Sequence, residues 1–173
     1  SWKLLWPTER LLPIAAELGS DVPFFLGHGA AICRGRGEQV EPLPATRPLH
    51  FVLVTPPGGL GTADVYRALD ATPESNAPQP GQAAALAAAL RRGSLAELGE
   101  RMGNGLQAAA ATLSPWVDRL RSAFARLNFV APQLSGSGSC YFGVCRHAHE
   151  ARRLATILRS QQLGLVYATR SCC

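Results

Sequence analysis

Lysine is almost missing from this sequence, and charged residues of either sign are few. Lys3 is the only lysine, so the formal net charge of +5 over 173 residues rests on arginine. An arginine-rich balance suits an anionic small molecule or a nucleotide, and a solvated basic surface explains it equally well. The basic residues form no run interleaved with aromatic residues, so nucleic-acid binding is not predicted.

The sequence also lacks the paired two-residue cysteine spacing of a zinc site, and no metal site is predicted. All its cysteines are expected to be reduced thiols. Three of them, Cys33, Cys140 and Cys145, lie in apolar stretches and are expected to act as small hydrophobic residues, whereas Cys172 and Cys173 lie at the end of the sequence. No stretch approaches the ~20 apolar residues of a membrane span, and the start does not resemble a signal peptide. We therefore expect a cytoplasmic protein without membrane contact.

The first 46 residues contain one helical pattern and several short strand-like runs. Apolar residues repeat at helical spacing between Pro7 and Gly19, and Gly19 is a suitable C-terminal glycine. Strands are expected at 24–26, 30–34 and 39–43. A cluster of prolines then marks a boundary, and we predict two domains, 1–46 and 47–173.

The rest of the chain interleaves strands with alanine-rich helices. Strands are expected at 50–55, 140–145 and 165–169, and a surface loop at 71–81. Helices are expected at 62–69, 82–91, 95–102, 105–113 and 148–158, with another one starting at Ser114-Pro115. This order favours an α+β fold in which helices cover one face of a mainly antiparallel sheet.

Asp21 is the first candidate for chemistry. It lies between Gly19 and the apolar run Val22-Pro23-Phe24-Phe25, which holds it in a fixed place. An aspartate before a Val-Pro pair is also a common turn or N-cap residue. In the functional interpretation, a carboxylate on a rigid turn orients a substrate hydroxyl and accepts its proton during attack on phosphorus.

The glycine-serine loop Ser135-Gly136-Ser137-Gly138-Ser139 is the second candidate. Small residues let the backbone approach a ligand closely, and successive N–H groups can form a nest for phosphate oxygens. A tight turn between a helix and a strand would use the same residues, so both interpretations stay open. The loop is neither a Walker A motif nor a Rossmann fingerprint, because the required lysine and the flanking elements are absent.

The order of several motifs resembles one known family. Gly19-Ser-Asp-Val-Pro-Phe-Phe25 is followed by Gly35-Arg-Gly-Glu38, Thr62-x-x-Val-Tyr66, Asn104-x-Leu106 and Ser135-Gly-Ser-Gly-Ser-Cys140. The pattern spans nearly the whole chain and is similar to that of the 4-diphosphocytidyl-2-C-methyl-D-erythritol kinases, which belong to the GHMP kinase superfamily.

The resemblance implies a fold, a reaction and a set of site residues. The fold would be the remnant of an N-terminal ribosomal-protein-S5-like domain followed by a ferredoxin-like C-terminal domain. The reaction would be ATP-dependent phosphorylation of a hydroxyl on the diphosphocytidyl substrate in non-mevalonate isoprenoid synthesis, with Mg²⁺. Asp21 falls on the catalytic aspartate, Tyr66 on the cytosine-stacking aromatic, Thr62 and Arg36 on the substrate pocket, and Ser135–Ser139 beside the phosphates.

The family's catalytic lysine and glycine-rich ATP loop would precede Ser1, so we expect a truncated chain that is inactive alone. The predicted partner is a nucleotide-diphosphate small molecule, and a homodimer is left open. Two alternatives remain: another GHMP kinase of the homoserine or mevalonate type, and a non-catalytic ferredoxin-like binding domain.

Overall fold

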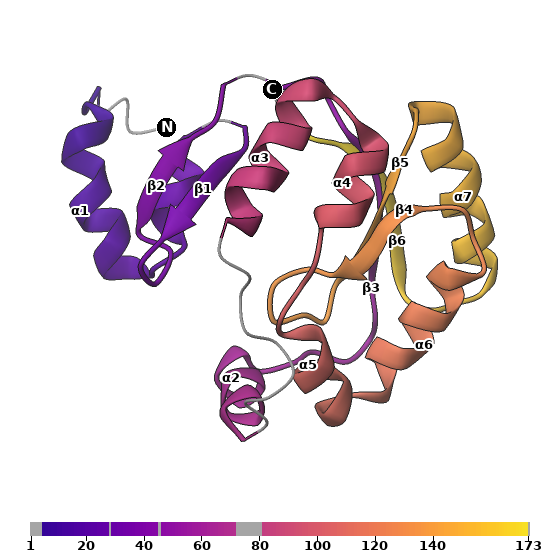
Figure 1. The fold of residues 1–173 in the computed structure, drawn as a ribbon. Coiled ribbons are helices and arrows are strands. Elements are labelled where there is room, and N and C mark those ends of the chain that lie inside the picture. Colours follow the sequence, from indigo (N-terminus) through magenta and orange to yellow (C-terminus); the bar gives the residue numbers. More distant parts are fainter. Residues whose placement is uncertain (1–4, 28, 45, 72–80, 173) are drawn as a thin grey trace. The chain divides into compact units, whose positions relative to one another are not determined.

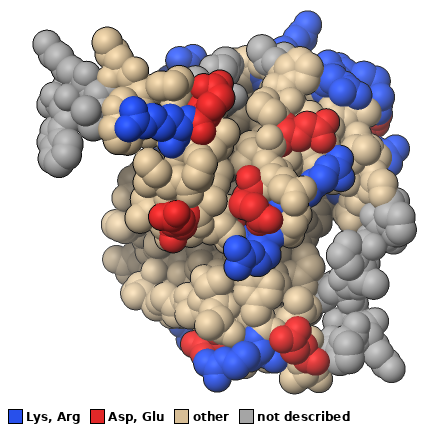
Figure 2. All heavy atoms as spheres, turned by 90° about the vertical axis from the view of Figure 1, so that its left-hand side faces the viewer, with Lys and Arg blue, Asp and Glu red and all other residues tan. Residues whose placement is uncertain are grey.

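The structure is a computed structural model that describes residues 5–27, 29–44, 46–71 and 81–172 (Figure 1). It divides into two compact units, Ser1–Arg47 with Cys172–Cys173, and Pro48–Ser171. The predicted loop at 71–81 lies almost entirely outside the described residues. On the face drawn in Figure 2, basic side chains lie next to acidic ones. Within the described ranges, no helix combines the length and apolar character needed to cross a membrane.

The first unit contains one helix, one 3₁₀ helix and a two-stranded hairpin. Helix α1 (Thr8–Leu18) starts after Pro7 and ends at Gly19, whose N–H donates to the Ala15 carbonyl. The strands β1 (Ala31–Arg34) and β2 (Gln39–Pro42) pair antiparallel. The predicted helix and these two strands are therefore confirmed.

The predicted strand at 24–26 is wrong, because this segment is the 3₁₀ helix η1 (Val22–Leu26). The Val22 N–H donates to the Gly19 carbonyl, and the Gly27 N–H donates to the Phe24 carbonyl. Pro23 presets the backbone angle φ of such turns, and a short apolar run carries no periodicity that separates them from a strand. Cys33 is exposed, whereas Cys145 is buried as expected.

The second unit is built on one antiparallel sheet with the strand order β4-β5-β3-β6. Its strands are β3 (His50–Thr55), β4 (Val130–Leu134), β5 (Tyr141–Cys145) and β6 (Leu165–Arg170). Its helices are α2 (Thr62–Asp70), α3 (Gln82–Arg92), α4 (Leu95–Arg101), α5 (Gln107–Leu113), α6 (Pro115–Ala125) and α7 (Ala148–Ser160). Strand β4 was not predicted, and a register irregularity between Val130 and Gln133 obscures its alternation.

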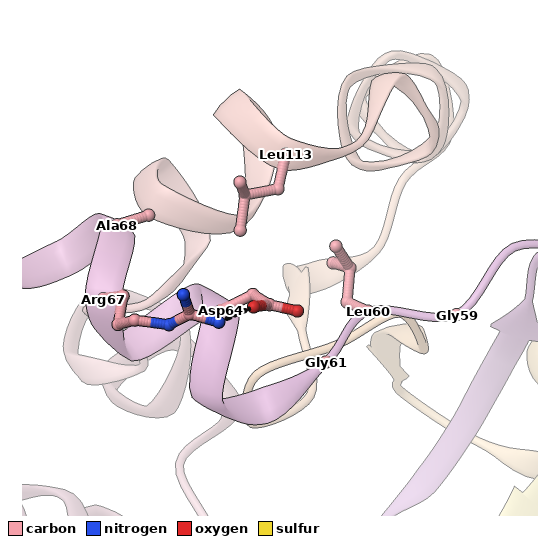
Figure 3. A pocket seen from close by; sticks show the side chains of 7 residues that line it. All are labelled: Gly59, Leu60, Gly61, Asp64, Arg67, Ala68 and Leu113. Carbon is pink, nitrogen blue, oxygen red and sulfur yellow. Dashed lines mark hydrogen bonds and ion pairs between the residues drawn. The ribbon is translucent and has the colours of Figure 1, made fainter.

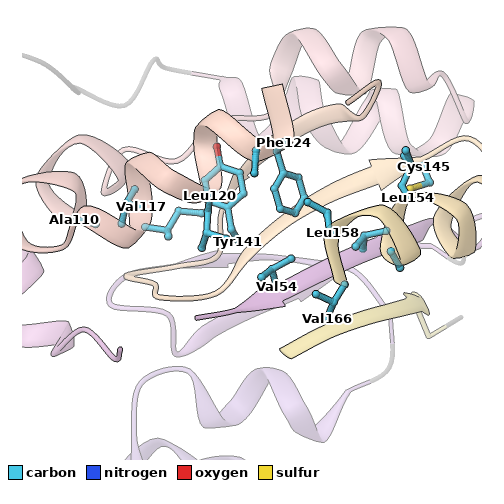
Figure 4. Packing of buried hydrophobic residues seen from close by; sticks show 14 of the residues in the cluster. Val54, Ala110, Val117, Leu120, Phe124, Tyr141, Cys145, Leu154, Leu158 and Val166 are labelled. Carbon is cyan, nitrogen blue, oxygen red and sulfur yellow. The ribbon is translucent and has the colours of Figure 1, made fainter. Parts of the chain in front are cut away.

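Helices α6 and α7 enclose the core against one face of this sheet (Figure 4). Val52 and Val54 of β3 are fully buried, as are Phe124 of α6 and Leu158 of α7. Burying each such side chain contributes about 1.5–3 kcal/mol relative to leaving it exposed. Tyr141 is also buried, and its hydroxyl donates to the Pro132 carbonyl at 3.3 Å, which satisfies the polar end of the ring.

Helix α4 lies against the opposite face of the sheet. The prediction that helices cover only one face is therefore wrong. Gly99 of α4 packs so closely on Val130 that a Cβ at Gly99 would stand 3.2 Å from the Val130 side chain. Val130 is paired with Val144, which points away from the Tyr141 side of β5. Farther along this face, Tyr167 of β6 stays about half exposed at 53%.

Candidate functional site

The glycine-serine loop connects β4 to β5 and is held in a tight conformation. The Ser135 N–H donates to the Cys140 carbonyl at 2.8 Å, and the Gly138 N–H donates to the Ser135 carbonyl at 2.9 Å. Gly136 and Gly138 have φ angles of 56° and 96°, which favour glycine. The loop therefore joins two strands, and not a helix to a strand as the turn interpretation assumed.

Asn104 fixes this loop from the segment between α4 and α5. Its Nδ2 donates to the carbonyls of Leu134 and Gly136, both at 2.8 Å, and its Oδ1 accepts from the Leu106 N–H at 2.8 Å. The Gln107 Oε1 accepts from the Leu134 N–H at 2.9 Å. The sequence pointed to Asn104 only through the Asn-x-Leu motif, and its clamping role appears only in three dimensions.

Thr62 meets the loop from the start of α2. The Thr62 and Ser137 hydroxyl oxygens lie 2.9 Å apart and share a hydrogen bond. Tyr66 follows one turn later on the same side of α2 and is 51% exposed, while its neighbour Val65 is fully buried. The second unit thus brings Thr62 and the glycine-serine loop together and places the Tyr66 ring near solvent.

A pocket of about 530 Å³ opens beside this region (Figure 3). It is lined by residues of the α2 entry, of α2 and of α5: Gly59, Leu60, Gly61, Asp64, Arg67, Ala68 and Leu113. Asp64 and Arg67 form an ion pair at its edge, and both side chains are more than half exposed. A Cβ at Gly138 would stand 3.1 Å from the Leu60 side chain, so Leu60 links the pocket to the glycine-serine loop.

Asp21 lies in the first unit at the start of η1. It occupies the N-cap position of η1, as the structural interpretation expected, but its side chain makes no cap hydrogen bond. It is exposed, and the turn between β1 and β2 approaches it so closely that a Cβ at Gly37 would stand 2.5 Å from its Oδ1. Burial, and then the charge of Asp21, raise the pKa of the nearby Cys33 thiol.

Arg36 lies in that same turn, with an exposed side chain. Its backbone N–H donates to the Glu38 carboxylate at 2.8 Å. Hydrogen bonds from the Glu38 and Arg36 amides, together with the Arg36 charge, lower the pKa of Glu38. The turn therefore holds Glu38 ionised and leaves the Arg36 guanidinium exposed.

Comparison with known proteins shows which proteins the chain resembles. The model for "GHMP kinases C terminal" matches residues 86–163. Proteins named 4-diphosphocytidyl-2-C-methyl-D-erythritol kinase are similar over most of the chain. The one from Thermobifida fusca is 40% identical over 92% of this chain and 52% of its own length, and the one from Pelotomaculum thermopropionicum is 35% identical over 91% and 54%. The chain is thus similar to GHMP kinases at 86–163 by the family model, and to these named kinases over most of its length.

Solved kinase structures are similar to nearly the whole chain. A crystal structure of 4-(cytidine 5'-diphospho)-2C-methyl-D-erythritol kinase matches with a TM-score of 0.78 and 35% identity, over 94% of this chain and 57% of that one. A homoserine kinase from Cytophaga hutchinsonii matches with a TM-score of 0.77 at 21% identity over 98% of this chain and 60% of that one, which shows the shared fold alone. The chain spans about half the length of the curated relatives it matches.

Proposed function

We propose that the protein containing these residues transfers the γ-phosphoryl group of ATP to the 2-hydroxyl of 4-diphosphocytidyl-2-C-methyl-D-erythritol. The observation that carries the proposal is the hydrogen bond between Thr62 and Ser137, 75 residues apart. It joins the motif expected at the substrate to the loop expected at the phosphates. The relatives at 35–40% identity that carry this name support the choice of substrate.

Asp21 is proposed as the group that takes the proton of the attacking hydroxyl. The hydroxyl oxygen forms a bond to the γ-phosphorus, the bond to the ADP oxygen breaks, and the hydroxyl proton passes to the carboxylate. An exposed aspartate whose carboxylate makes no cap hydrogen bond has lone pairs for this role. The close approach of Gly37 limits the space on one side of the carboxylate and so restricts its orientation.

The glycine-serine loop is proposed to hold the phosphates. Its glycines leave the backbone open, and the clamp by Asn104 keeps the loop in one shape before the nucleotide binds, which reduces the entropy lost on binding. Among the described residues, no group of three or more His, Cys, Asp or Glu could hold a metal ion. We therefore propose that Mg²⁺ is carried mainly by the nucleotide phosphates, as is common for this ion.

Tyr66 is proposed to stack on the cytosine, with Thr62 and Arg36 contacting the substrate. Its ring is half exposed while the neighbouring Val65 is buried, so the ring can contact a ligand without disturbing the core.

Three further expectations stay predictions: the cytoplasmic compartment, the domain limits 1–46 and 47–173, and a homodimer.

The test measures which phosphate acceptor the full-length protein uses. ADP release with ATP and Mg²⁺ is measured with the diphosphocytidyl substrate, with homoserine and with mevalonate. We expect release with the first acceptor alone. Release with homoserine or mevalonate would favour another GHMP kinase, and binding of the cytidyl compound without any ADP release would favour a binding domain.

A further inference from the structure

A second pocket, of about 390 Å³, lies where β3 and α7 begin and β6 ends. It is lined by basic and small residues: His50, Ala148, Ala151, Arg152, Ala168, Thr169 and Arg170. All of them belong to the second unit, and none belongs to the site proposed for phosphoryl transfer. The pocket is large enough for a small polar molecule.

The sheet register places its basic groups on one side. His50 is paired with Arg170 across the β3-β6 ladder, so both side chains point to the same face of the sheet. Val52 and Val54 alternate with His50 on β3 and are buried on the α7 side. Arg152 belongs to α7, which packs on this face, and it approaches the pocket from the helix.

The charge in this pocket is uncompensated. Its lining contains two arginines and a histidine but no carboxylate, and neither Arg152 nor Arg170 has an ion pair within the described part of the chain. Glu150, the acidic residue of the first turn of α7, is paired with Arg146 instead. Alanines at 148, 151 and 168 leave room between the long side chains.

We propose that this pocket binds a small phosphate-bearing anion, of the size of pyrophosphate. Planar guanidinium groups from two separate elements can each donate two hydrogen bonds to phosphate oxygens. The pocket and the Thr62 end of the candidate site lie beyond opposite ends of β3. A strand of this length spans about 17 Å at ~3.3 Å per residue, so the two sites are separate.

The experiment titrates inorganic pyrophosphate into the 173-residue chain, with calorimetry for affinity and amide NMR shifts for location. Shifts at Ala148, Thr169 and Arg170 distinguish this pocket from the glycine-serine loop. We expect Arg152→Gln and Arg170→Gln each to raise the Kd for pyrophosphate, determined from the shifts at this pocket, at least fivefold. Arg153→Gln, an exposed neighbour on α7 outside the pocket, should change it less than twofold.

Three results would overturn the proposal. One is an absence of shifts at the pocket, and another is an equal loss of affinity in Arg153→Gln, which would indicate diffuse surface charge. The third is tighter binding of a single-stranded oligonucleotide than of pyrophosphate at the same residues, which would indicate a nucleic-acid surface. Arg170→Lys keeps the positive charge but loses the paired guanidinium donors, so it should give an intermediate Kd for pyrophosphate. Melting curves verify that each variant folds.

Discussion

Asp21 shows how a single residue can be available for chemistry while its surroundings are fixed. Its backbone begins η1, whereas its carboxylate is exposed and caps nothing. A residue of this kind contributes little to folding, so its replacement should separate function from stability.

We expect Asp21→Asn to lower kcat of the product of the whole reading frame by at least about 100-fold, because the amide keeps the shape but cannot take a proton. The free energy of unfolding should change by less than about 0.5 kcal/mol, as for other exposed positions. Glu41→Gln removes an exposed carboxylate of the same unit and is the matched control. Turnover of Asp21→Asn close to that of the unaltered enzyme would exclude Asp21 from the mechanism.

Tyr66 can be tested in the same way, to separate a role in substrate binding from a role in packing. Stacking of a base on an aromatic side chain is worth about 1–3 kcal/mol, so Tyr66→Ala should raise the Kd for the cytidyl substrate about 5- to 150-fold. Tyr66→Phe keeps the ring and should bind nearly as well. Tyr167→Ala removes a tyrosine of similar exposure from β6 and should leave the Kd unchanged. A loss of stability with unchanged affinity would instead assign Tyr66 to packing.

At the scale of elements, the β4-β5 connection depends on an amide side chain from outside the sheet. Asn104→Ala removes two hydrogen bonds to loop carbonyls and should lower the free energy of unfolding by about 1–2 kcal/mol. It should also raise KM for ATP, because the glycine-serine loop that we propose to hold the phosphates is no longer fixed. Asn104→Asp keeps the acceptor for the Leu106 N–H but cannot donate, so it should resemble Asn104→Ala if the carbonyl contacts matter. If Asn104→Asp instead behaves like the unaltered protein, the Leu106 contact alone matters.

The start of α7 is a second element with a measurable local interaction. The Glu150 carboxylate accepts from the Arg146 backbone N–H at 2.7 Å and from its guanidinium at 2.9 Å. Burial raises the pKa of Glu150, but these hydrogen bonds and the charges of Arg146 and His147 outweigh it, so the net pKa lies below its usual value. The carboxylate therefore stabilises the fold above the unfolded pKa of about 4.3, and this contribution is lost as the pH falls through the lower folded pKa.

Glu150→Gln should accordingly lower the free energy of unfolding by about 1–2 kcal/mol at pH 7. The difference from the unaltered protein should shrink as the pH falls below the unfolded pKa of about 4.3 and through the lower folded pKa. Urea unfolding at several pH values measures this dependence. Glu100→Gln, which removes an exposed carboxylate from α4, is the matched control. A constant difference at all pH values would mean that shape, and not charge, is responsible.

At the scale of the whole molecule, we expect the proposed activity to require more than the second unit. The chain spans about half the length of the relatives that share its motifs. Phosphoryl transfer relies on positioning the nucleotide in line with the acceptor, and a loop that contacts phosphates from one side cannot do this alone. We expect the isolated 173-residue chain to turn over less than about 1% as fast as the product of the whole reading frame. Comparable rates would place a complete ATP site within these residues.

The elements with strong local signals were predictable from the sequence. The apolar run at 50–55, the caps around 114–115 and the helical spacing at 148–158 each reflect interactions between near neighbours, and the structure confirms them. The segment 24–26 and strand β4 were not predictable, because a short apolar run and a strand with an irregular register lack a clear period. The candidate residues Asp21 and Tyr66 and the glycine-serine loop were found through motifs and their order.

The sequence by itself therefore determined most elements, the α+β class and the residue types available for phosphate chemistry. Only the tertiary structure decided which of them meet. Thr62 and Ser137 are 75 residues apart, and Asn104 lies 30 residues before Leu134, one of the two residues whose carbonyls it binds. The arginines of the second pocket, Arg152 and Arg170, meet only because α7 folds back onto the sheet beside β6. Such contacts depend on the order of the strands in the sheet and on how the helices pack on it. Interactions between residues that are close in sequence do not determine either of these.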